Sequence, residues 1–82
     1  MNESHEEVDW SEVSIIDILK IAIAHEVEAR EYYRHAADCT GNPHTRELLL
    51  RLSEMEQGHA DQLQQELNDL RIQRDTETAM AD

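Results

Sequence analysis

Glu56 and His59 stand three residues apart in the segment Glu56-Gln57-Gly58-His59, and both side chains are of types that bind metal ions. Residues three apart on an α-helix project from one face, so a carboxylate and an imidazole at this spacing can reach the same ion. Helical bundles that hold a pair of metal ions use this arrangement. The pair taken alone is weak evidence, because an ordinary solvated pair on an acidic helix has the same spacing.

The surroundings of the pair favour ligands over a solvated pair. Steps of three and four residues define one stripe on each of two predicted helices. The first stripe is Ile15, Leu19, Ala22, Glu26, Ala29, Tyr33 and Ala36, and the second is Leu49, Leu52, Glu56, His59, Leu63, Glu66 and Leu70. Both are mostly apolar, with polar groups near the middle. A charge among leucines costs several kcal/mol unless it is paired, protonated or bound to a metal.

The chain predicts one helical unit with three parts. Its 82 residues include only two glycines and one proline, so there is little turn punctuation and no room for a second domain. We expect an acidic lead-in over residues 1–12, a helical hairpin over residues 13–74 and a polar tail over residues 75–82. The first helix begins at Ser14 or, equally well, at Ser11.

The turn between the two helices is the most clearly marked boundary. The first helix is expected to end near Cys39, with Gly41 closing it in the left-handed conformation. Asn42 and Pro43 fit the N-cap and first position of the second helix, which is expected to end at about Arg74.

Depth along such a hairpin brings the polar groups together. Glu26 precedes Gly41 by 15 residues and Glu56 follows Asn42 by 14, so they lie roughly 22 Å and roughly 21 Å from the turn at about 1.5 Å per residue. His59 lies about one turn further out. Antiparallel helices would therefore gather Glu26, Glu56 and His59 into one patch midway along the apolar face.

Two helices cannot enclose that patch, so the fold class we predict is an all-α, two-helix antiparallel hairpin that dimerises into a four-helix bundle. Around a twofold axis, two copies each of Glu26, Glu56 and His59 would provide four carboxylates and two imidazoles. These are the ligands of a two-metal site. These ligand types suit iron or manganese, and zinc is also possible on ligand chemistry alone. Two irons can each give one electron to dioxygen, which is a ferroxidase reaction.

Composition limits the partners. The hydrophobic fraction of 39% includes no Phe, one Trp and two Tyr, so a lone chain builds a small core. The net charge of −12 argues against nucleic acid and against an anionic membrane surface, and it suits cations. The single cysteine, Cys39, forms no internal disulfide, and residues 1–8 show no signal-peptide pattern. We therefore expect a cytoplasmic protein.

Two motifs resemble the ferritin-like superfamily: Glu-Val-Glu-Ala-Arg-Glu-Tyr-Tyr, from Glu26 to Tyr33, and the later Glu56-x-x-His59. Rubrerythrin domains, which belong to that superfamily, have motifs of the same kind. The interval of 30 residues between Glu26 and Glu56 is similar to that of the encapsulated ferritin family, and the resemblance covers residues 21–67. It implies a ferroxidase centre shared between two subunits, with Tyr33 beside the metals. It also implies homodimers that assemble into a ring and deliver iron to an encapsulin shell for storage.

The chain departs from that family's pattern at three places. A secondary metal site near the entrance uses two carboxylates in the family, and the matching residues here are His25 and Glu28. The family has an aromatic residue just before the site tyrosine, and the residue here, Tyr32, keeps the aromatic ring but adds a hydroxyl. Residues 75–82 lack the small and apolar docking peptide that directs family members into shells.

Two other functions fit the same residues. One is a rubrerythrin-like oxidase or peroxidase that consumes oxidants without storing iron. The other is a non-catalytic helical-hairpin interaction module whose polar groups bind no metal. The sequence leaves open the physiological metal, the number of dimers in an assembly, the fate of the iron, and the roles of Cys39 and the acidic lead-in.

Overall fold

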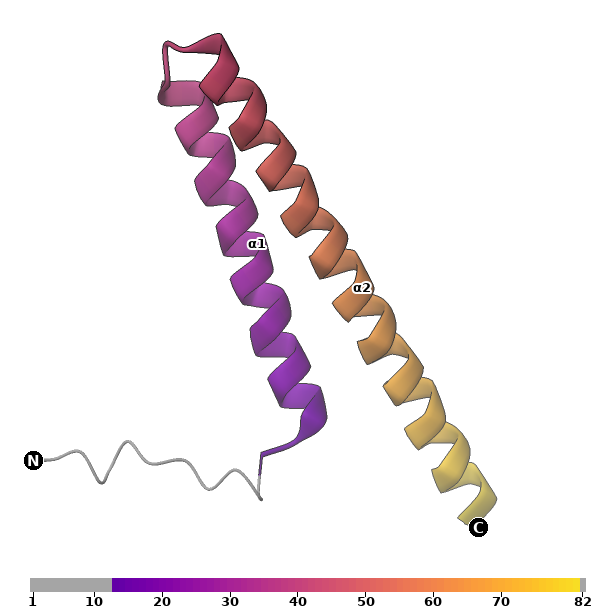
Figure 1. Cartoon of the computed structure of the whole chain (residues 1–82). Coiled ribbons are helices and arrows are strands. Elements are labelled where there is room, and N and C mark those ends of the chain that lie inside the picture. Colours follow the sequence, from indigo (N-terminus) through magenta and orange to yellow (C-terminus); the bar gives the residue numbers. More distant parts are fainter. Residues whose placement is uncertain (1–12, 82) are drawn as a thin grey trace, which may run out of the picture.

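Two antiparallel helices make up the described part of the chain (Figure 1). This computed structural model describes residues 13–81, with side chains as far as residue 76. Helix α1 spans Ile15–Cys39 and helix α2 spans Pro43–Ala81, and no strand occurs among the described residues. The all-helical hairpin predicted from the sequence is therefore confirmed. The acidic lead-in, residues 1–12, lies outside the described residues.

Helix α1 begins at Ser14, the first of the two starts that the sequence allows. Ser14 has an extended backbone, and its hydroxyl oxygen accepts a hydrogen bond from the Ile16 amide at 3.1 Å. This bond satisfies one of the amide donors that a helix leaves unpaired in its first turn.

Helix α2 begins as predicted, with Asn42 as N-cap and Pro43 as its first residue. The Asn42 side-chain oxygen accepts hydrogen bonds from the amides of His44 at 2.9 Å and Thr45 at 3.0 Å. Proline fits the first position because it has no amide hydrogen to leave unpaired and its φ is already helical.

The predicted left-handed Gly41 is wrong, because no described glycine has a positive φ. Helix α1 ends instead through Thr40, whose backbone is extended. Arg46 of α2 donates from Nε to the Ala37 carbonyl at 3.2 Å and from an Nη to the Thr40 carbonyl at 2.7 Å. The guanidinium therefore satisfies the Ala37 carbonyl, which a left-handed cap would otherwise serve, and also the carbonyl of the C-cap residue Thr40.

The predicted end of α2 near Arg74 is also wrong, because the helix continues to Ala81. The stretch 75–81 contains neither glycine nor proline, and its Ala, Glu and Met residues are good helix formers. Helix α2 has 39 residues against 25 in α1, so its distal end extends past the start of α1 (Figure 1).

The seam between the helices is lined mainly by small side chains. Its buried members are Ala37 of α1 and Ser53, Ala60 and Leu67 of α2, and the three on α2 are spaced seven residues apart. That repeat keeps one line of α2 against its neighbour. Among the described residues, no large side chain is fully buried. The hydrophobic stabilisation available within one hairpin is correspondingly small.

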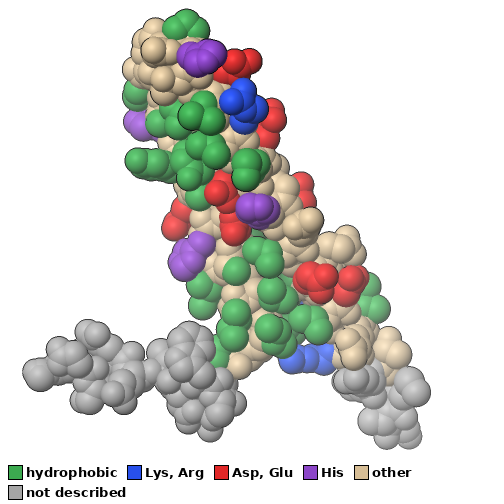
Figure 2. All heavy atoms as spheres, viewed as in Figure 1, with side chains coloured by type: hydrophobic (Ala, Val, Ile, Leu, Met, Phe, Trp, Pro, Cys, Tyr) green, Lys and Arg blue, Asp and Glu red, His purple; other side chains and the backbone are tan. Residues whose placement is uncertain are grey.

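The two sides of this seam differ in character. On one side lies a mostly apolar surface, called here the open face. Its half-buried members are Leu19, Ala22, Glu26, Ala29, Tyr33, Leu49, Leu52, Glu56 and Leu63, with the more exposed His59 among them. Figure 2 shows hydrophobic side chains gathered above and below a band of Asp, Glu and His side chains midway along the hairpin. The described helices include none with the length and hydropathy needed to cross a membrane.

Enlarging Ala60 should separate the helices. Ala60 is 6% exposed in the seam, and added methylenes in a packed contact cost about 1–3 kcal/mol. We expect Ala60→Leu to lower the midpoint of denaturation, which is measured by circular dichroism. The same change at the exposed Ala24 of α1 should leave the midpoint near that of the wild type. Equal effects at the two positions would contradict the observed seam.

Candidate metal centre

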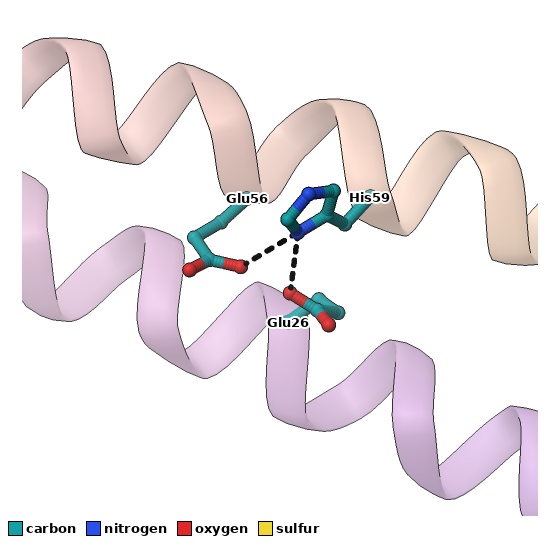
Figure 3. A group of neighbouring side chains, drawn as sticks. All are labelled: Glu26, Glu56 and His59. Carbon is teal, nitrogen blue, oxygen red and sulfur yellow. Dashed lines mark hydrogen bonds and ion pairs between the residues drawn. The ribbon is translucent and has the colours of Figure 1, made fainter.

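Three potential ligands converge midway along the hairpin (Figure 3). Glu26 comes from α1, and Glu56 and His59 come from successive turns of α2. The His59 Nδ1 lies 3.5 Å from Glu26 Oε1 and 3.3 Å from Glu56 Oε1. One ligand atom from each residue lies within 4.8 Å of the other two. We call these three residues the carboxylate–imidazole cluster.

The cluster forms because the two helices run side by side from one short turn, so residues equally far from the turn in the sequence lie at the same depth. Glu26 and Glu56 are separated from the turn by nearly equal numbers of residues, so an antiparallel pair brings them to one level. His59 is one turn beyond Glu56 and on the same face of α2. The structure therefore brings together the three residues that the sequence singles out, although their binding of a metal stays a prediction.

The cluster lies on the open face, beside the seam. The side chains of Glu56, Glu26 and His59 are 20%, 29% and 51% exposed. The hairpin therefore covers part of each side chain, and the rest of each side chain is open to solvent. An ion bound there would have one side available for further ligands.

Glu56 dominates the electrostatics of Glu26. A side-chain hydrogen bond with Glu56, partial desolvation and the negative charge of Glu56 raise the pKa of Glu26 above its usual 4.5, and His59 lowers it by less. Two carboxyl groups this close favour holding a proton between them. A metal cation supplies the same compensation and displaces the proton when it binds.

The donor set fits a hard or borderline divalent cation. Two carboxylates and one imidazole nitrogen suit iron, manganese or zinc, and three donors leave coordination positions vacant for an octahedral ion. Within the part of the chain that the structure describes, no other group of three or more metal-binding side chains lies close enough together.

The other residues singled out in the sequence lie outside the cluster. Tyr33 is half-buried on the open face, two helical turns from Glu26, with its ring centroid 5.7 Å from that of Tyr32. His25 and Glu28 are exposed on α1 on either side of Glu26 in the sequence. Their roles as a site tyrosine and as a secondary metal site stay predictions.

Sequence analysis did not single out a group of polar residues that joins the helices at the same depth. Arg30 of α1 contacts both Ser53 and Gln57 of α2. The seven-residue spacing of Ser53 from Ala60, and of Ala60 from Leu67, is a signal in the sequence that places Ser53 in the seam. No comparable signal indicates the partners of Arg30.

The raised pKa of Glu26 makes a prediction about the metal-free protein. Between pH 4.5 and the raised pKa of the folded state, the unfolded chain has released this proton while the folded chain still holds it. The contribution of Glu26 to stability is therefore lost as pH rises through its folded pKa. With a chelator present, we expect the melting temperature of the wild type to fall more steeply with rising pH than that of Glu26→Gln. Glu28→Gln, which makes the same charge change at an exposed position, should follow the wild type. Parallel curves for wild type and Glu26→Gln would show that Glu26 is not coupled to Glu56.

Most of the chain matches the model of a known protein family. The family model described as rubrerythrin matches residues 17–81, a range that includes the whole carboxylate–imidazole cluster. No curated protein and no solved structure shows a significant match. Because the matched range is well over half of the chain, this protein belongs to the rubrerythrin family, within the ferritin-like superfamily.

Proposed function

We propose that two copies of this hairpin form a four-helix bundle and that its shared centre oxidises ferrous to ferric ions with dioxygen. The observation that carries the proposal is the meeting of Glu26, Glu56 and His59 on the open face of a single hairpin. The rubrerythrin family match supports a diiron-type protein. Iron storage or detoxification is the purpose that this reaction would serve.

The second copy is inferred from what one hairpin lacks. One hairpin offers three donors and leaves their outer side accessible, whereas a pair of metal ions needs about twice that number. The face around the cluster is also apolar, and its Leu19, Leu52 and Leu63 are only half-buried. A twofold axis through this face would bury those side chains and double the donors in one step.

Each residue of the cluster has a defined task in this reaction. Glu26 and Glu56 provide the negative charge that attracts ferrous ions, which are the substrate, and Glu26 gives up its proton as an ion binds. His59 provides a neutral nitrogen donor. Carboxylate oxygens favour the more highly charged ferric product, so the ligand set promotes loss of one electron from each ion to dioxygen.

A finer assignment extends this proposal to the encapsulated ferritins. It rests on the 30-residue interval between Glu26 and Glu56. With it come a ring of dimers, delivery of iron to an encapsulin shell in the cytoplasm, Tyr33 next to the ions, and a secondary metal site at His25 and Glu28.

The family match also favours a second candidate, a rubrerythrin-like oxidase or peroxidase that stores no iron. The two candidates share the cluster and differ in the oxidant and the product. An enzyme of the second kind would consume hydrogen peroxide in preference to dioxygen and leave no ferric mineral. Peroxide consumed per iron oxidised therefore distinguishes them.

Loss of either α2 ligand should abolish most of the iron oxidation. Mutating even the outer partners of a metal ligand costs about 10- to 100-fold, so we expect Glu56→Ala and His59→Ala to lower the rate by at least about tenfold. The measurement is the absorbance of ferric product after aerobic addition of ferrous ions. Glu54→Ala, which removes an exposed carboxylate of the same helix, should keep the wild-type rate. Wild-type rates in both ligand variants would rule out this centre.

Association of the hairpins should depend on the metal. Bringing two clusters together without cations sets four carboxylates against one another, which opposes association. We expect sedimentation velocity to show dimers or larger species with Mn²⁺ and a shift toward monomer with a chelator. An identical distribution under both conditions would instead support the non-catalytic interaction module.

A further inference from the structure

Arg30 joins the two helices on the side of the seam away from the open face. The Ser53 hydroxyl donates a hydrogen bond to the Arg30 carbonyl at 3.3 Å, and the Arg30 guanidinium donates to the Gln57 side-chain oxygen. Ser53 is 4% exposed and the Arg30 side chain is 22% exposed, so water competes little for these bonds. We call Arg30, Ser53 and Gln57 the Arg30 clasp.

Neighbouring side chains fix the orientation of both partners in the clasp. Glu31 accepts a hydrogen bond from the Arg30 Nε at 2.9 Å and forms an ion pair with one Arg30 Nη at 2.7 Å, while the other Nη reaches Gln57 of α2. The Gln57 amide nitrogen donates to Asp61 at 2.9 Å, so its oxygen is the atom available to Arg30. The contact is therefore directional.

The clasp and the carboxylate–imidazole cluster lie at the same depth. Arg30 is four residues from Glu26, so the two are about 6 Å apart along α1. On α2, Ser53 lies three residues before Glu56, and Gln57 lies directly after Glu56. Each side of the clasp is thus tied through about one helical turn or less to a cluster residue.

The turn and the Arg46 hydrogen bonds tie the helices at one end of the hairpin, whereas the seam beyond them resists sliding only weakly. Its buried residues are small apart from Leu67, so few bulky side chains interlock there. A slip of one residue moves Glu56 and His59 by about 1.5 Å relative to Glu26. Metal sites tolerate errors of only about 0.5 Å in the placement of their ligands.

From these observations we infer that Arg30, Ser53 and Gln57 are positioning residues, which set the register of α1 against α2 and thereby place Glu26 opposite Glu56 and His59. The inference rests on the proposed function for its consequence, which is metal binding, and on the metal-free structure for the register itself. Among the described residues, no hydrogen bond or ion pair joins the clasp to the cluster, so the clasp acts through the backbone of the two helices.

Register is measured without metal. Spin labels at Ala24→Cys and Asn68→Cys, both exposed, report the distance between α1 and α2 in a Cys39→Ser chain. Labelled chains are diluted with unlabelled ones, and a chelator is present. We expect Arg30→Met and Gln57→Leu to shift or broaden the distance distribution. Arg34→Met is the matched control, because Arg34 is 59% exposed and pairs with Glu31 of its own helix. Distributions unchanged in Arg30→Met would overturn the inference.

Mn²⁺ affinity measures the consequence. We expect Arg30→Met and Gln57→Leu to weaken binding roughly tenfold, the effect typical of an outer partner of metal ligands. Arg34→Met removes an exposed arginine of the same helix that is not part of the clasp, and it should bind as the wild type does. If the wild type binds but Arg30→Met binds equally well, the positioning role is wrong. If the wild type binds no Mn²⁺, the proposed function fails, while the spin-label distances still decide whether the clasp sets the register.

Discussion

Two carboxyl groups from different helices face each other on a surface that is otherwise apolar, and the rest of the structure must accommodate this. Glu56 raises the pKa of Glu26, so the metal-free hairpin favours a proton where a cation would fit. His59 Nδ1 stands within 3.5 Å of both carboxylates, so the three side chains together could hold a metal ion. Such a cluster is unfavourable as a purely structural feature, because like charges among apolar side chains oppose folding. A bound cation removes that cost.

A single hairpin also leaves part of its apolar surface exposed to solvent. Small residues, Ala37, Ser53 and Ala60, occupy the seam and bring the helices close, but they bury little area. Several larger apolar side chains, among them Leu19, Leu52 and Leu63, lie half-buried on the open face, where one hairpin alone does not cover them fully. A second copy across that face would bury them and supply the missing donors. Folding, association and metal binding are in this view three aspects of one contact.

The two edges of the seam have different tasks in this arrangement. The open face carries the carboxylate–imidazole cluster, whereas the opposite edge carries the directional bonds of Arg30 with Ser53 and Gln57. Small seam residues allow close approach but specify alignment poorly, and hydrogen bonds with fixed geometry compensate for that. Membership of the rubrerythrin family fits a scaffold in which a metal pair is held between helices.

The sequence alone determined the features that depend on neighbours along one helix or on distance from the turn. Asn42 and Pro43 mark the start of α2, and residue counts to Glu26 and Glu56 predict their common depth, because rise per residue is nearly constant. The tertiary structure decided what depends on contacts between helices. Arg46 caps α1 across the turn and removes the need for a left-handed Gly41, and Arg30 finds partners 23 and 27 residues away. Helical periodicity shows which residues share a face, but it does not show which residue of the neighbouring helix each one meets.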